Sequence, residues 1–158
     1  MRIAYCDPPY IGQAKKHYNS EEVDHKVLIK HLETFDGWAL SLSSPTLRQI
    51  LSYCADNVRV GAWVKPFCSF KPNINPAYAW EPVIFKPARA LGRDVDTMRD
   101  WVSCNITLRR GLVGVKPEGF CYWIFGVLGM KPEDEFYDLF PGTNAVTKAW
   151  EKWRIRLF

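Results

Sequence analysis

The chain has 158 residues, 47% of them hydrophobic, and a net charge of +4 at pH 7. This length and apolar content suit one domain over residues 1–158 with a real core, and they leave no room for a second domain. No apolar run approaches the roughly 20 residues of a membrane span, and the five scattered cysteines lack disulfide or zinc spacing, so we expect reduced thiols in a cytoplasm, no metal and no membrane partner.

The N-terminal stretch predicts a strand that runs into a rigid acidic turn. Residues 3–5 have the apolar, β-branched and aromatic character of a short buried strand, and Pro8 ends it because proline has no N–H to donate. Asp7 should therefore lie at the carboxyl end of a strand, where ligands bind in open α/β sheets. Because Pro8 and Pro9 fix φ, the Asp7 carboxylate, the Pro8 carbonyl and the Tyr10 ring should keep a nearly constant mutual geometry.

This geometry suits methyl transfer to the exocyclic amine of a nucleobase. An adenine N6 amine is a poor nucleophile because its lone pair is delocalised into the ring. The Asp7 carboxylate and the Pro8 carbonyl can accept its two N–H hydrogens and free the lone pair, while Tyr10 stacks on the base. Taken alone, the same four residues could also be an ordinary turn.

A loop follows, and then an alternation of helices and strands. Lys15 and Lys16 lie in a polar stretch without apolar period, which is either a lid on a phosphate backbone or a solvated loop. Apolar spacing predicts a helix over 24–35 and strands over 38–42 and 58–64. Between these strands we expect a helix over 44–54, with Ser44 as its N-cap and Pro45 at its first position. The alternation predicts a largely parallel sheet with right-handed crossovers, the α/β class.

The middle of the chain carries loops and basic residues. Residues 67–79, including Lys71, show no period and predict a functional loop before a strand over 80–86. Residues 87–115 are the most basic segment and include Arg109 and Arg110. A short basic segment of this kind binds phosphates more readily than it reads base edges, although a solvated charged surface has the same composition.

The C-terminal third predicts a helix and then a second ligand-binding turn. A helix should begin at Pro117 and stop at Gly129. Residues 135–144 are typical of a strand followed by a tight turn, and residues 145–157 of a helix. This arrangement directs backbone N–H groups and the positive end of the helix dipole at the turn, where Gly142 allows a ligand close to the backbone.

Four motifs together resemble one enzyme family. Residues 7–10 (Asp-Pro-Pro-Tyr) resemble the catalytic signature of S-adenosylmethionine-dependent amino-methyltransferases that act on adenine N6 in DNA, and residues 135–144 resemble their cofactor loop, acidic-x-Phe-x-Gly-x-Gly. Residues 63–66 (Trp-Val-Lys-Pro) with Glu81, and Lys116 with its proline before a helix, also resemble the family. The resemblance covers nearly the whole chain, with the catalytic motif before the cofactor motif. Small DNA methylases of phages and prophages are the most similar.

The resemblance implies a fold, a reaction and a site. The implied fold is a reduced, circularly permuted Rossmann-like α/β domain, and the implied reaction transfers a methyl group from S-adenosylmethionine to adenine N6 in single- or double-stranded DNA, in the cytoplasm of a bacterial host. The implied catalytic residues are Asp7, Pro8, Pro9 and Tyr10. The implied cofactor-binding residues are Cys6, Asp7, Lys116, Asp138, Leu139, Phe140, Gly142 and Asn144. The implied nucleic-acid contacts are Lys15, Lys16, Lys65, Lys71, Arg109 and Arg110.

The sequence departs from this family in two places. Asn144 stands where the family usually has its second glycine; asparagine can adopt positive φ, but its side chain enters the path of the cofactor methionine. Two strands that follow the cofactor helix in the family are absent, so the strand near Phe136 should be a sheet edge that needs a cover or a partner. Either a second copy pairs with this edge, or the aromatic and basic tail, Trp150, Trp153, Arg154 and Arg156, covers the cofactor's adenosine. Two alternatives therefore remain: a binding module without turnover, and an enzyme that acts on RNA. For Lys65 and Glu81, a purely structural role is also an alternative.

Overall fold

The first strand, β1 (Arg2–Cys6), lies inside a sheet and is buried on both faces. Ile3 and Tyr5 belong to one core cluster and Ala4 and Cys6 to another, and all four are fully buried. Successive side chains of a strand point to opposite faces, so an unbroken apolar run is what a doubly covered strand requires. The computed structural model describes residues 1–12, 21–67, 72–92, 95–107 and 115–155.

Within the described residues, the sheet has six strands, and five of them run the same way. From one side to the other their order is β5 (Trp101–Ser103), β3 (Arg59–Val64), β4 (Trp80–Lys86), β2 (Gly37–Ser41), β1 and β6 (Glu135–Asp138). β1 pairs in parallel with β2 and β6, and β3 with β5, whereas β4 is antiparallel to both of its neighbours. The predicted largely parallel α/β sheet is confirmed, and β4 returns from β3 to lie between β3 and β2.

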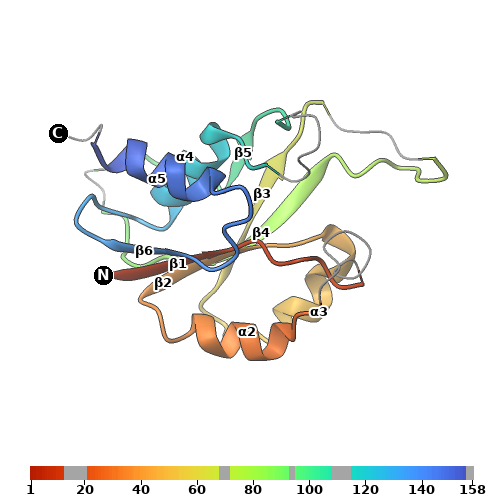
Figure 1. The fold of residues 1–158 in the computed structure, drawn as a ribbon, viewed down its shortest axis with the longest axis horizontal. Helices are drawn as coiled ribbons and strands as arrows, with labels where there is room; N and C mark the ends of the chain where they lie inside the picture. The colour runs from red at the N-terminus through yellow and green to blue at the C-terminus, as the bar shows by residue number, and fades with distance from the viewer. Residues whose placement is uncertain (13–20, 68–71, 93–94, 108–114, 156–158) are drawn as a thin grey trace.

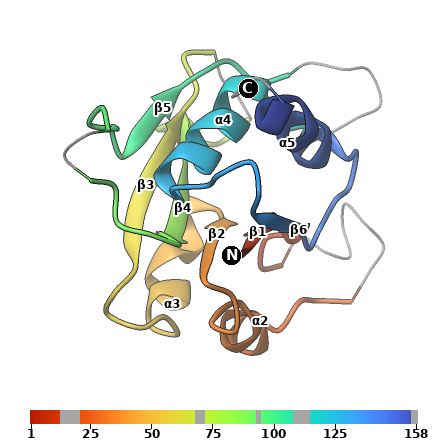
Figure 2. The same cartoon turned by 90° about the vertical axis from the view of Figure 1, so that its left-hand side faces the viewer.

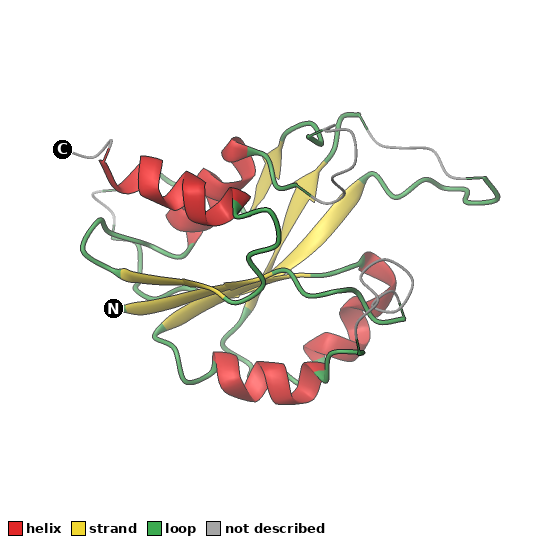
Figure 3. Cartoon of the chain, viewed as in Figure 1, coloured by secondary structure: helices red, strands yellow, loops and turns green. Residues whose placement is uncertain are grey.

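Helices cover both faces of the sheet (Figures 1 and 3). On one face lie α2 (His25–Leu32) and α3 (Leu47–Leu51), the latter preceded by a 3-10 turn, η1 (Ser44–Thr46). On the other face lie α4 (Glu118–Val127) and α5 (Ala145–Ile155). Each pair of helices packs on its own core cluster, with the sheet between them. Within the residues the structure describes, no helix has the length and apolarity needed to cross a bilayer.

The predicted helix boundaries are largely confirmed, with one correction. Asp24 caps α2, since its carboxylate accepts from the backbone N–H groups of the second and third residues after it. Ser44 is not the cap of the next element: Ser43 holds the N-cap position, Ser44 is the first residue of η1, and Pro45 is the second. At the end of α4, Gly129 has φ +66°, the left-handed conformation of a helix stop.

The sequence did not predict the strand β5, but it did predict that β6 is an edge of the sheet. β5 lies within the basic segment 87–115 as a three-residue strand at the side of the sheet far from β6 (Figure 2). Trp101 and Ser103 are exposed and Val102 is half-buried, so the segment has no apolar run to reveal it. β6 forms the opposite edge, as predicted, and no other described strand pairs with its outer side.

Candidate active site

The Asp-Pro-Pro-Tyr turn leaves the sheet at the carboxyl end of β1. β1 pairs with β2 through Cys6, and Asp7 is the first residue beyond the strand. Pro8 is buried, whereas the Asp7 side chain keeps 22% of its surface exposed. This edge of the sheet therefore presents a carboxylate that is almost enclosed and still accessible.

Four charged side chains meet beside this turn, and we call Asp7, Lys65, Glu81 and Lys116 the carboxyl-edge cluster. The Lys116 ammonium lies 3.0 Å from Asp7 Oδ2 and 3.3 Å from Glu81 Oε2, and Glu81 Oε1 pairs with Lys65. Lys116 is only 7% exposed. The hydroxyl of Tyr10 donates to Glu81. Two cations and two carboxylates from four separate segments thus form one buried cluster of zero net charge.

The reversal of β4 explains how Glu81 reaches this place. Because β4 runs against its neighbours, its first residues, not its last, lie at the carboxyl edge, where Glu81 pairs with Trp63 in register. The Trp63 ring forms the floor of the cluster, with the Lys65 ammonium 4.5 Å and the Lys116 ammonium 5.3 Å from its centroid. Its Nε1–H donates to the Cys104 carbonyl at 2.8 Å, which fixes the ring.

The surroundings treat the two carboxylates differently. Burial raises the pKa of Asp7 above its ordinary value, and the opposing pull of the Lys116 ammonium offsets this only in part. Burial acts on Glu81 in the same sense, but Lys116 and Lys65 together outweigh it and lower its pKa. For Lys116, burial is outweighed by Asp7 and its other anionic neighbours, so its pKa is raised. Of the two carboxylates, Asp7 is therefore the one whose charged form is less stabilised.

The glycine turn leaves the sheet next to the Asp7 turn. β6 is the parallel neighbour of β1, with Asp138 opposite Tyr5 in register, and the Leu139 N–H donates to the Tyr5 carbonyl at 3.0 Å. Gly142 has φ +46° and Asn144 has φ +57°, so asparagine does adopt the conformation that the family assigns to glycine. The two motifs from opposite ends of the chain thus emerge side by side at one edge of the sheet.

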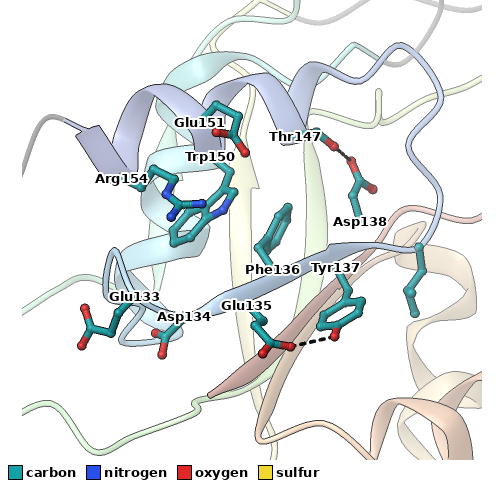
Figure 4. Close-up of a pocket in the computed structure, with 11 residues that line it drawn as sticks. Glu133, Asp134, Glu135, Phe136, Tyr137, Asp138, Thr147, Trp150, Glu151 and Arg154 are labelled. Atoms are coloured by element: carbon teal, nitrogen blue, oxygen red, sulfur yellow. Dashed lines mark hydrogen bonds between the residues drawn. The ribbon is translucent and has the colours of Figure 1, made fainter.

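A groove of about 660 Å³ lies between β6 and α5 (Figure 4). Asp138 stands at one end of it and accepts from the Thr147 hydroxyl at 3.0 Å through Oδ2. Its Oδ1 is buried, and the carboxylate also accepts from the backbone N–H groups of Phe140 and Thr147, so its own turn and helix largely satisfy it.

The other predicted site residues do not all lie at this edge of the sheet. Cys6 is fully buried in the core, so its thiol cannot reach the edge. Leu139 and Phe140 pack partly against the cluster beneath α2 and α3. Trp150, which the sequence suggested as part of a cover for the cofactor's adenosine, is 3% exposed and belongs to the core, although it also lines the groove. Predicted contacts that fall outside the described residues are Lys15, Lys16, Lys71, Arg109 and Arg110.

Glu81 and Trp63 are the residues whose place the sequence did not settle. Both occur in motifs that resemble the family, but a glutamate at the start of a strand is equally an ordinary loop cap. The missing information was the direction of β4. Had the connection between residues 64 and 80 been taken as a hairpin, Glu81 would have fallen at the same edge as Asp7.

Comparisons with known proteins place this architecture. No protein-family model and no curated protein sequence matches the chain. Among solved structures, M1.HpyAVI in complex with SAM superposes with a TM-score of 0.63 at 16% identity, over 97% of this chain and 77% of that one. M1.HpyAVI alone gives 0.64 at the same identity, over 97% and 76%. The fold is thus the Rossmann-like α/β fold of methyltransferases.

Proposed function

We propose that the protein transfers a methyl group from S-adenosylmethionine to the N6 amine of adenine in DNA. The observation that carries this proposal is the pairing of β1 with β6, which brings the Asp-Pro-Pro-Tyr turn and the glycine turn to one edge of the sheet. The likeness to M1.HpyAVI in its SAM complex supports the choice of cofactor and of DNA. Adenine, and not cytosine, is proposed because Asp7 opens the motif; relatives that methylate cytosine N4 usually carry serine there.

The chain's own residues account for the activation of the amine. Asp7 Oδ2 is held by Lys116, which leaves Oδ1 to accept one N–H hydrogen, and the Pro8 carbonyl accepts the other. The nitrogen lone pair would then form the new N–C bond as the methyl–sulfur bond breaks, and the nitrogen would release one proton to water. Tyr10, whose hydroxyl is tied to Glu81, stacks on the base. Positioning carries most of the catalysis here, because the sulfonium supplies a reactive methyl group and leaves as a neutral thioether.

Residues of the glycine turn would hold the cofactor. The Asp138 carboxylate would offer an acceptor at the end of the groove, and the backbone at Gly142 is open to close approach. α5 begins at Ala145 and directs its positive end toward the turn. Asn144 projects a side chain where the family has none, so we expect weak cofactor binding.

Nucleic-acid contacts are proposed for the basic residues around this edge. Lys15, Lys16, Lys65, Lys71, Arg109 and Arg110 would contact phosphates, which gives affinity with little sequence specificity. Lys65 is already paired with Glu81, so its ammonium would have to bind Glu81 and a phosphate at the same time. We place the reaction in the cytoplasm of a bacterial host, as for the phage and prophage methylases that the motifs resemble.

The test is incubation with methyl-labelled S-adenosylmethionine and genomic DNA, followed by mass spectrometry of the nucleosides. We expect the label in N6-methyl-2′-deoxyadenosine. Label only in methylcytosine would contradict the choice of base, and label only when RNA replaces DNA would contradict the choice of nucleic acid. The matched control is DNA in which purine replaces adenine, because this DNA has no adenine N6 amines.

A binding module without turnover is the second candidate, and Asn144 is the observation that favours it. With a side chain at this turn, the fold could persist after the cofactor site is lost. Calorimetry separates the two: heat of binding with S-adenosylmethionine is expected for the enzyme, whereas no heat at millimolar cofactor together with retained DNA binding supports the module.

We also propose that the outer side of β6 pairs with a second copy of the chain. An edge strand presents unpaired backbone groups, and the groove beside it is open. Light scattering after size-exclusion chromatography should then give a dimer mass at micromolar concentration. A monomer mass at that concentration contradicts the pairing.

A further inference from the structure

We propose, on the basis of the function above, that Lys116 is a positioning residue for Asp7, and that Glu81 regulates how strongly it acts. The ammonium of Lys116 lies between the two carboxylates, 3.0 Å from Asp7 and 3.3 Å from Glu81. Both contacts are to side chains at the edge where the amine would bind, which assigns Lys116 a role toward Asp7 distinct from the cofactor contact that the motif suggests.

The first step is the orientation of Asp7. The terminal torsion of an aspartate is broad and roughly two-fold, so a carboxylate at the end of a strand can turn. Lys116 binds Oδ2, and no described residue donates a hydrogen bond to Oδ1. One oxygen is therefore anchored from inside the protein, and the other would accept from the amine. Lys116 can do this because it is itself held: Trp63 and Phe120 lie under its ammonium, with ring centroids at 5.3 and 5.7 Å.

The second step is the charge balance. An ammonium that served Asp7 alone would neutralise it and weaken its grip on an amine hydrogen. Here Glu81 shares Lys116, and Lys65 in turn pairs with Glu81, so the attraction of Lys116 for Asp7 is divided. Lys116 and Glu81 therefore act on the Asp7 carboxyl in opposite directions: the cation favours its ionised form and the anion disfavours it. Charged and titratable groups that act on or are affected by Asp7 are Lys116, Glu81, Lys65, Asp138, Tyr5, Cys6 and Tyr10.

The opposite signs make the proposal testable with two substitutions. Lys116→Met removes the cation, so the acid limb of the pH profile of kcat should move to higher pH by about one unit or more. Activity on the acid side then falls about tenfold for each unit of that shift and recovers at higher pH. Glu81→Gln keeps the shape of the side chain and should move the limb to lower pH.

A matched control comes from the other end of β4. Lys86 pairs with Glu33 at 2.9 Å, and both side chains are largely buried, but this pair is far along the strand from Asp7. Lys86→Met should leave the limb in place. The midpoint of the Asp7 carboxyl is followed in parallel by NMR of protein labelled at the aspartate carboxyl carbon, with the Asp7 signal assigned by its absence from Asp7→Asn. This titration needs no turnover.

The outcomes separate this proposal from the proposed function. Opposite displacements of the limb and of the NMR midpoint in Lys116→Met and Glu81→Gln support it. If Lys116→Met loses the same fraction of activity at every pH, or if both variants move the midpoint the same way, Lys116 only supports the fold and the proposal is overturned. If the wild type methylates no nucleic acid, the proposed function has failed, and the NMR midpoints alone then decide whether Lys116 and Glu81 oppose each other at Asp7.

Discussion

Two carboxylates, the partly exposed Asp7 and the buried Asp134, lie at opposite ends of the parallel pair formed by β1 and β6, and their surroundings differ. Asp134, just before β6, has a fully buried side chain and accepts from Arg89 through both oxygens, at 2.6 and 2.7 Å. The Lys131 N–H and the N-terminal ammonium, at 2.7 and 3.0 Å, complete its contacts. Asp7, just after β1, has one cation at one oxygen and nothing described at the other.

The difference appears in how each carboxyl holds its charge. Burial alone would raise both pKa values, but the hydrogen bonds from Arg89 and Lys131 outweigh it at Asp134 and lower that pKa. At Asp7 burial prevails and the pKa is raised. A carboxylate whose acceptor sites are all occupied serves the fold. One that is left short of donors is available to a ligand, and the expected cost is stability.

Removing Asp134 should have the largest effect on stability. Asp134→Ala leaves the Arg89 guanidinium without its partner, and breaking a buried ion pair costs about 3–5 kcal/mol. We expect the free energy of unfolding, measured by urea titration, to fall by that amount, while methyl transfer per folded molecule is unchanged. A decrease in the free energy of unfolding of less than about 1 kcal/mol would contradict the structural role assigned to Asp134.

The same carboxyl predicts how acid affects the fold. Its pKa in the folded protein is depressed, so its stabilisation is present above the unfolded value near 3.9 and is lost as the pH falls below it toward the folded value. The wild type should lose about 2–3 kcal/mol that Asp134→Ala does not lose between about pH 5 and pH 2. Urea titrations of both proteins at several pH values measure the difference, and parallel curves would contradict it.

A change at the open side should affect ligand binding and leave the fold intact. Asn144→Gly removes a side chain from the turn while keeping its positive φ accessible, and we expect S-adenosylmethionine to bind up to about tenfold more tightly, about 1.4 kcal/mol. Asn73→Gly is the matched control, because Asn73 has φ +63° in a loop outside the site. Equal affinities of Asn144→Gly and the wild type in calorimetry would exclude Asn144 from the cofactor path.

Asp7 itself should show the smallest effect on stability, with the opposite sign. Its folded pKa is raised, so its ionisation disfavours the folded state at neutral pH, and this cost disappears as the pH falls through the folded value toward about 4. Asp7→Asn should therefore be slightly more stable than the wild type at pH 7, since Glu81 still pairs with the Lys116 ammonium, with the gain shrinking in acid. A destabilised Asp7→Asn would place Asp7 with Asp134 among the structural carboxylates.

Local patterns in the sequence predicted most of the elements around the site. The residues before Asp7 form a buried strand because an unbroken apolar run next to a proline has few other solutions. Asp24 and Gly129 mark helix ends through their own side chain and backbone. These features depend on residues close together in the chain, and the structure confirms them.

What could not be predicted depends on partners distant in the chain. β5 is a strand because β3 offers it hydrogen bonds; Trp101 and Val102 favour a strand, but three residues are too short a pattern to predict one. The carboxyl-edge cluster joins segments from β1, β3, β4 and the start of α4, and its charge balance depends on the reversal of β4. The spacing of these residues in the sequence does not predict that Lys116 lies between Asp7 and Glu81.

Asp7→Ala provides the most direct measurement of whether the Asp7 turn performs methyl transfer. Methyl incorporation into DNA and the affinity for S-adenosylmethionine are measured on the same preparation. We expect incorporation to fall by about 10³-fold or more, with cofactor affinity close to that of the wild type and an unfolding midpoint no lower. Retained incorporation in this variant would contradict the account.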